Sequence, residues 1–183
     1  QPPIAWDVEL AQWFELYFAR LHKKRSFARI SRRQASSPDI PRPRYVPEEA
    51  LLEGRTFAVV LDTSGSMDRK ILAKALGAIA SYCMSRDVPA VRLVFCDAYA
   101  YDEGYVAAET IAQRVRVRGR GGTVLQPGID LLESLEDFPK KGPILIITDG
   151  FCDNLSVKRE HAYLLPQGRY LPFHPKGPVF RIT

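Results

Sequence analysis

Two continuous apolar runs constrain the fold of this chain more than any other feature of its sequence. The first is FAVVL at residues 57–61, and the second is PILII at residues 143–147. Neither run alternates between apolar and polar residues, as a strand with one solvent-exposed face would. This pattern is typical of strands that are buried on two sides, so the sheet that contains them needs helices on both faces.

The sequence around these runs alternates between strand and helix patterns. Strands followed by amphipathic helices predict an α/β fold, with a Rossmann-like, mostly parallel central sheet flanked by helices. We expect helices at 69–86, 107–115 and 124–135, and strands at 55–61, 90–96, 143–150, 170–174 and 179–182.

An N-terminal segment, residues 1–54, precedes this α/β domain, which we expect to span residues 55–183. Residues 4–22 carry apolar side chains at helical spacing and predict an amphipathic helix of about five turns. Its apolar face either covers an edge of the domain or docks on an upstream domain or a partner. The basic, proline-containing segment that follows predicts an extended connector.

Composition limits the class of protein. With 183 residues, of which 46% are hydrophobic, the chain can bury a full core. No apolar stretch reaches the roughly 20 residues that cross a bilayer, and the start of the chain lacks a signal-peptide pattern, so we expect no membrane contact. The three cysteines show no CxxC spacing and the three histidines no metal-ligand spacing. Reduced thiols without a disulfide framework predict a cytoplasmic protein.

The positive charge of the chain is local. The segment from Arg20 to Arg44 contains nine basic residues and a single acidic residue, Asp39, whereas the whole chain has a net charge of +5. Such a segment can bind nucleic acid through counterion release. Only Phe27 and Tyr45 could stack on bases within it, and a solvated surface is the simpler interpretation.

Three predicted loops carry side chains with oxygen ligands. The first loop holds Asp62, Ser64 and Ser66 directly after an apolar strand; Thr123 follows two glycines before a helix, and Asp149 ends the second apolar strand. Ligands of open α/β sheets bind beyond the carboxyl ends of the strands, so we expect these side chains to meet there. An all-oxygen set suits a small hard cation. Mg²⁺ is therefore the expected cofactor, with Mn²⁺ as an alternative.

Each of these residues also has a purely structural interpretation. Ser66 or Asp68 could cap the following helix, and Asp149 with Gly150 could form an ordinary turn. The order of the three motifs along the chain favours the metal site over a coincidence of capping and turn residues.

The stretches FAVVLDTSGSMD, GRGGTVLQPGIDLL and PILIITDG resemble the metal-ion-dependent adhesion site of von Willebrand factor type A (VWA) domains. The resemblance implies direct metal ligation by Ser64, Ser66 and Thr123. It also implies that Asp62 and Asp149 act through water or outer contacts, and that an acidic residue of a partner completes the site. The chain is also similar to bacterial VWA-like proteins of unknown function that follow a metallopeptidase-like region and accompany MoxR-type AAA+ ATPases. Its tail, residues 151–183, departs from the family pattern.

These observations predict a non-enzymatic, metal-dependent protein-interaction module that captures an acidic side chain of a partner. A MoxR-type AAA+ ATPase is the candidate partner that the resemblance implies. The segment before Thr123 carries three arginines that we expect to attract an acidic partner: Arg116, Arg118 and Arg120. The alternative is that they lie on a solvated edge strand, where their charge prevents pairing with another chain. A metal-dependent hydrolase of phosphoesters or peptides is the second hypothesis, and nucleic-acid binding through residues 20–44 is the third.

Overall fold

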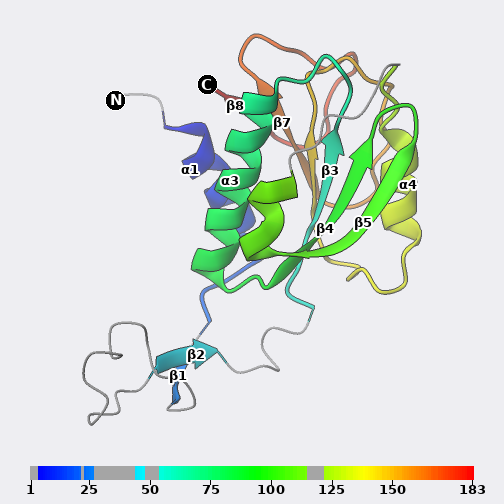
Figure 1. Cartoon of the computed structure of the whole chain (residues 1–183). Coiled ribbons are helices and arrows are strands. Elements are labelled where there is room, and N and C mark those ends of the chain that lie inside the picture. The colour runs from blue at the N-terminus through cyan, green and yellow to red at the C-terminus, as the bar shows by residue number, and fades with distance from the viewer. Residues whose placement is uncertain (1–3, 22, 27–43, 48–53, 115–121) are drawn as a thin grey trace.

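The computed structural model of the chain describes residues 4–21, 23–26, 44–47, 54–114 and 122–183. Its centre is a six-stranded sheet with the strand order β5-β4-β3-β6-β7-β8, as Figure 1 shows. All neighbouring pairs are parallel except β4 and β5, which are antiparallel. The strands are β3 (Ala58–Asp62), β4 (Ala90–Cys96), β5 (Ala100–Ala107), β6 (Ile144–Ile147), β7 (His161–Pro166) and β8 (Val179–Ile182).

Helices cover both faces of this sheet, which confirms the predicted α/β fold. Helices α1 (Trp6–Phe14) and α3 (Arg69–Arg86) lie on one face, and α4 (Gln126–Ser134) lies on the other (Figure 1). Val59 and Leu61 of β3 pack in the core on the side of α1 and α3, whereas Val60 packs in the core with α4. Because both faces of β3 are buried, its sequence has no polar alternation.

Helix α3 begins and ends at the residues that the sequence predicted. Asp68 is its N-cap, and the Asp68 carboxylate accepts a hydrogen bond from Lys70 N at 2.7 Å. At the other end Asp87 adopts a left-handed conformation (φ 56°), and its N–H bonds to the carbonyl of Cys83. Since Asp68 provides the cap, the hydroxyl of Ser66 is not needed for this purpose.

The N-terminal helix packs against the α/β domain. Phe14 is fully buried, with its ring centroid 4.3 Å from that of Phe57 and 4.9 Å from that of Tyr82. The apolar face therefore covers the domain, as one of the two interpretations predicted. The helix is shorter than the expected 4–22, because it ends at Phe14 and the apolar pattern continues in a turn whose Phe18 also contacts Phe57.

Part of the predicted connector forms a small hairpin. Strands β1 (Lys23–Ser26) and β2 (Arg44–Pro47) pair antiparallel in a separate two-stranded sheet. In Figure 1 this hairpin lies apart from the six-stranded sheet. The remainder of the basic segment, 27–43, and residues 48–53 lie outside the described residues.

Besides the hairpin strands β1 and β2, two strands of the six-stranded sheet were not predicted, and one predicted strand was wrong. Strand β5 contains Asp102, Glu103 and Gly104, residue types that are depleted in strands, and it was overlooked for that reason. Strand β7 is completely buried and runs parallel to β6. Residues 170–174 form no strand but an irregular loop from which Leu171 and Phe173 pack on the core. Phe173 contacts the ring of Tyr163.

The other elements differ from the sequence predictions by smaller amounts. The predicted 107–115 helix is a 3-10 segment, η2 (Ala108–Arg114), and α4 begins two residues after the predicted start at 124. Strand β8 coincides with the predicted 179–182. Parallel strands β6, β7 and β8 follow one another without a helix in the described residues 148–160 and 167–178.

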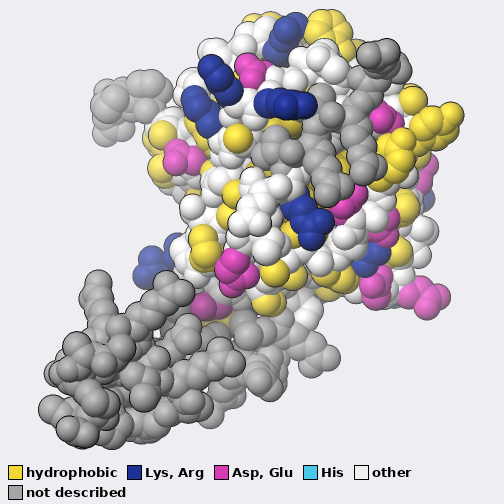
Figure 2. All heavy atoms as spheres, viewed as in Figure 1, with side chains coloured by type: hydrophobic (Ala, Val, Ile, Leu, Met, Phe, Trp, Pro, Cys, Tyr) yellow, Lys and Arg dark blue, Asp and Glu magenta, His cyan; other side chains and the backbone are white. Residues whose placement is uncertain are grey.

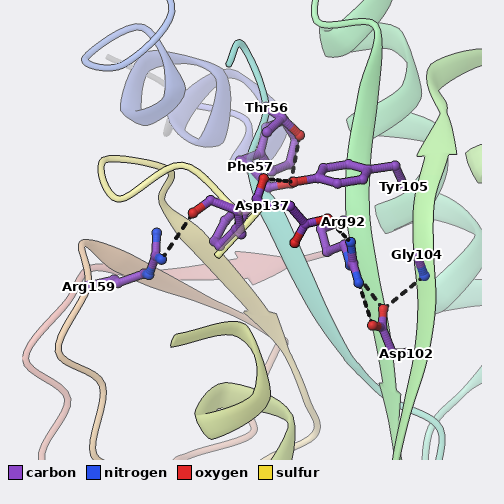
Figure 3. A network of polar contacts seen from close by, with 9 residues as sticks. Thr56, Phe57, Arg92, Asp102, Gly104, Tyr105, Asp137 and Arg159 are labelled. Atoms are coloured by element: carbon purple, nitrogen blue, oxygen red, sulfur yellow. Dashed lines mark hydrogen bonds and ion pairs between the residues drawn. The ribbon is translucent and has the colours of Figure 1, made fainter. Parts of the chain in front are cut away.

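Arg92 of β4 fixes the antiparallel edge of the sheet (Figure 3). Its Nε and Nη2 atoms donate to the two carboxylate oxygens of Asp102 on β5 at 3.0 and 2.5 Å. Its Nη1 atom donates to Asp137 Oδ2 at 3.0 Å, and the guanidinium lies 4.9 Å from the centroid of the Tyr105 ring. Arg92 thereby joins β4, β5 and the loop that follows α4.

Candidate metal centre

The loop after β3 places three of the predicted ligands together at the carboxyl edge of the sheet. Asp62 is the last residue of β3, between β4 and β6, and is fully buried. Its Oδ1 atom accepts a hydrogen bond from Ser64 N at 2.9 Å, which turns the chain back over the strand end. The hydroxyl oxygens of Ser64 and Ser66 lie 3.0 Å apart, with Ser64 buried and Ser66 exposed.

The loop after β6 brings a second carboxylate to the same place. Thr148 donates from its hydroxyl to Asp62 Oδ2 at 2.8 Å and so connects the ends of β3 and β6. The next residue, Asp149, is only 3% exposed and accepts from Phe151 N through Oδ1 at 3.0 Å. Its other oxygen, Oδ2, is buried and has no hydrogen-bond partner among the described residues. A buried carboxylate oxygen without a partner is costly unless a cation or a donor faces it.

The last predicted ligand, Thr123, is held beside these loops by backbone contacts of the residues that follow it. Val124 N donates to the carbonyl of Asp97, which follows β4, at 2.8 Å. Leu125 N and Gln126 N donate to the two carboxylate oxygens of Asp153 at 2.7 and 3.1 Å. The Thr123 side chain is partly exposed, and no hydrogen bond between described residues uses its hydroxyl.

Asp153 is a functional candidate that sequence reasoning missed. It connects the segment after Asp149 to the start of α4, where it satisfies two backbone N–H groups at a helix N-terminus. An acid four residues after Asp149 was visible in the sequence, but its role depends on the distant α4.

The electrostatics of the centre favour a bound cation. Burial raises the pKa of the Asp62 carboxyl, hydrogen bonds from Ser64 and Thr148 lower it, and the neighbouring Asp149 carboxylate raises it again. Asp62 and Asp149 thus repel each other inside the protein. A divalent cation between such groups would relieve both the repulsion and the cost of burying them.

Cys152 borders the same centre. Burial raises the pKa of its thiol to about 12; a hydrogen bond with Thr148 opposes this shift, and Asp153, Asp62 and Asp149 reinforce it. The thiol is therefore protonated at neutral pH.

The donor set fits a hard cation better than a soft one. No group of three or more His, Cys, Asp and Glu residues in the described part of the chain could hold a metal ion. Any metal at this place would depend on the hydroxyls together with the two carboxylates, all of them oxygen ligands suited to Mg²⁺ or Mn²⁺. Arg116, Arg118 and Arg120, the predicted partner-binding residues, lie outside the described residues.

Comparison with protein families identifies the fold. The model of the VWA-like domain family DUF2201 matches residues 57–158, which is more than half of the chain. The chain belongs to this family. The match covers Asp62 and Asp149 at the ends of β3 and β6 and Thr123 before α4, and it stops just before β7 of this VWA-like domain.

A solved structure supports the same fold for the VWA-like domain. An aerotolerance-related membrane protein from Bacteroides fragilis NCTC 9343, crystallised with multiple mutations to serines, is similar with a TM-score of 0.52 and 17% sequence identity. The similarity covers 70% of this chain and 91% of that one, and at this identity it shows the fold alone. No curated protein matches the sequence. Among the described helices, none has the length and apolar character needed to span a bilayer.

Proposed function

We propose that this VWA-like domain binds a partner protein through a Mg²⁺ ion held by Asp62, Ser64, Ser66, Thr123 and Asp149, with Mn²⁺ as a substitute. The observation that carries the proposal is the buried Oδ2 atom of Asp149, which has no hydrogen-bond partner in the described part of the chain and shares the centre with the buried, negatively charged Asp62. VWA-like domains commonly mediate protein interactions, which agrees with a binding role.

The residues of the proposed centre have two roles, ligation of the ion and neutralisation of its charge. The hydroxyls of Ser64, Ser66 and Thr123 would hold the ion, while Asp62 and Asp149 would neutralise its charge. Mg²⁺ takes six oxygen ligands and keeps several waters, so it supplies positions that an acidic side chain of a partner can fill. Ser66 and Thr123 are accessible to solvent, and a partner would approach from their side.

Capture of a partner explains the centre better than covalent catalysis. A hydrolase that used Cys152 as its nucleophile would need a thiolate, and burial, the largest cause, raises the pKa of this thiol above its ordinary value and disfavours the thiolate. The acidic partner that we propose is a protein, and a MoxR-type AAA+ ATPase is the class that the sequence resemblance suggests.

The first test follows Mn²⁺ by electron paramagnetic resonance, in which the signal of the free ion is lost on binding. Wild-type protein should bind Mn²⁺, and Mg²⁺ should compete for the same site. The double variant Ser64→Ala, Ser66→Ala should bind neither ion, whereas the control Ser134→Ala, whose hydroxyl bonds to Leu131 O within α4, should match the wild type. Equal binding by the wild type and the double variant would refute the proposed ligands.

The second test concerns the partner. Wild-type protein should retain a MoxR-type AAA+ ATPase in Mg²⁺ and release it when a chelator is added, and the double variant should not retain it. Retention that survives chelation would show that the metal plays no part in the contact.

A further inference from the structure

Large apolar side chains surround the candidate metal centre on the outside of the molecule. Tyr99, Val124, Phe151 and Tyr170 have exposed fractions of 70%, 37%, 61% and 76%. They belong to four loops, which follow β4, precede α4, follow β6 and follow β7. We call these four residues the apolar rim. Exposed aromatic side chains that cluster around a site are typical of interaction surfaces.

One half of the apolar rim is attached to the loop that carries Asp149. Phe151 donates its backbone N–H to Asp149 Oδ1 at 3.0 Å. Gly150 has φ +90°, and a Cβ atom at this position would collide with the carbonyl oxygen of Tyr170. The backbone of Tyr170 therefore lies directly against the residue that follows Asp149.

The other half of the apolar rim is attached to Asp97. Tyr99 N donates to Asp97 Oδ1 at 2.9 Å, and Val124 N donates to the Asp97 carbonyl at 2.8 Å. Val124 directly follows Thr123 in the chain. Every member of the rim is thus fixed through its backbone next to a residue of the metal centre or to the Asp97 turn that supports Thr123.

Two arginines pack on the exposed rings. The guanidinium of Arg169 lies 5.1 Å from the centroid of the Phe151 ring, and that of Arg181 lies 5.1 Å from the Tyr170 ring. Arg181 also donates to the carbonyl of Arg169. Neither arginine forms an ion pair with a carboxylate of the described residues. Figure 2 shows Lys or Arg side chains beside hydrophobic ones at the top of the molecule, over the loops that follow the strands.

We infer that the partner segment carries an aromatic or large aliphatic residue and a second acidic residue close to the acidic residue that reaches the metal. This inference rests on the proposed function. The apolar residue would lie on Phe151 and Tyr170, and the second carboxylate would pair with Arg169. A protein segment suits this surface better than single-stranded nucleic acid, because two rim residues, Phe151 and Tyr99, bond through their backbone N–H groups to the carboxylates of Asp149 and Asp97. These carboxylates would repel a chain of phosphates.

A phage-displayed peptide library tests the inference. The peptides keep one Asp at the centre and carry three randomised residues on each side, and selection on wild-type protein is run in Mg²⁺ and in chelator. Clones enriched only in Mg²⁺ should share an aromatic or large aliphatic residue and a second acid. The double variant Phe151→Ala, Tyr170→Ala should lose the apolar preference, and Arg169→Gln should lose the acidic one.

The affinity of each variant for the enriched peptides, compared with that of the wild type, measures how much each rim residue contributes to binding. Each of these variants should bind them about tenfold more weakly, as expected when interface aromatic or arginine residues are removed. Met84→Ala with Leu16→Ala removes side chains that are 54% and 75% exposed on α3 and after α1, and it should leave affinity unchanged. Thermal melting checks that every variant is folded.

The outcomes separate this inference from the proposed function. Enrichment that depends on Mg²⁺ but shows no preference beside the fixed Asp, or affinities that the rim variants leave unchanged, would overturn the inference and leave the proposed function standing. If neither Mg²⁺ nor Ser64→Ala, Ser66→Ala alters the selection, both are wrong. A single-stranded oligonucleotide could instead bind more tightly than the enriched peptides, with an affinity that is insensitive to chelator and lost in the rim variants. This result would show that the rim binds nucleic acid and not a protein segment.

Discussion

The buried carboxylate of Asp149 imposes a cost on the metal-free protein. One of its oxygens has no partner among the described residues, and the fully buried Asp62 repels it. Removing one negative charge should therefore help the metal-free fold while it weakens metal binding. A residue with only a structural role would show the opposite pattern, because its loss would harm the fold under every condition.

Asp149→Asn tests this directly. An amide keeps an acceptor for Phe151 N but removes the charge, so in chelator the variant should unfold at the same urea concentration as the wild type or a higher one. In saturating Mg²⁺ the wild type should gain about 2.7 kcal/mol at a hundredfold excess over Kd, and the variant should gain none. Asp130→Asn, on the exposed side of α4, should keep the wild-type response. A clear loss of stability in chelator would show that Asp149 is structural.

Gly150 and Gly168 form a matched pair for the contact between the loops after β6 and β7. Both have positive φ angles, 90° and 77°, but an added Cβ would meet the Tyr170 backbone only at Gly150 and open space at Gly168. Gly168→Ala should cost about 1–2 kcal/mol from backbone strain. Gly150→Ala should cost clearly more by urea denaturation. Equal losses would mean that Tyr170 is not fixed against Gly150.

At the scale of elements, Asp153 connects α4 to the loop after β6. Asp153→Ala leaves the N–H groups of Leu125 and Gln126 without an acceptor and should destabilise the protein by about 1 kcal/mol, the usual cost of losing a helix cap. Because Thr123 would lose part of its support, Mn²⁺ binding should also weaken. Asp130→Ala, which loses only a side-chain contact with Gln126, should change stability by less than about 0.5 kcal/mol and leave Mn²⁺ binding intact.

The antiparallel edge of the sheet should depend on pH. Hydrogen bonds from Arg92 hold the pKa of the Asp102 carboxyl below its ordinary value. The stabilisation is therefore present above the ordinary pKa of about 4 and is lost as the pH falls through the lower folded value. Asp102→Asn should lose about 2 kcal/mol at pH 7, and its difference from the wild type should shrink in acid.

Asp137 provides the control for this edge. Its side chain is 60% exposed, so Asp137→Asn should cost less than about 1 kcal/mol. Chemical denaturation between pH 2 and pH 7 measures both variants. A difference for Asp102→Asn that stays constant over this range would refute the pairing.

The sequence was informative wherever a signal was local. The bounds of α3 followed from its apolar spacing, although the choice between Ser66 and Asp68 as its cap needed the structure. Asp62, Ser64 and Ser66 were found because they are neighbours after one apolar strand. Strand β5 was missed because it is stabilised by a distant partner, Arg92, and not by strand propensity. Residues 170–174 were misassigned because an apolar loop that packs on a core has the composition of a strand.

At the scale of the whole molecule, the folded unit extends beyond the family match at residues 57–158. The sheet continues through β7 and β8 up to Ile182, and Leu10, Trp13 and Phe14 of α1 belong to the same core as α3. A cation at the carboxyl edge of this sheet would connect the loops after β3 and β6 with the start of α4. Metal binding should consequently stabilise the entire unit and not a single loop.

Thermal melting of the metal-stripped protein, titrated with Mg²⁺, Mn²⁺ and Ca²⁺, measures this effect most directly. The melting temperature of the wild type should rise with Mg²⁺ and Mn²⁺, more than with Ca²⁺, because the compact hydroxyl and carboxylate set favours smaller ions. The double variant Ser64→Ala, Ser66→Ala should show no rise. Identical melting of the two proteins at millimolar Mg²⁺ and Mn²⁺ would contradict a metal centre at this edge of the sheet.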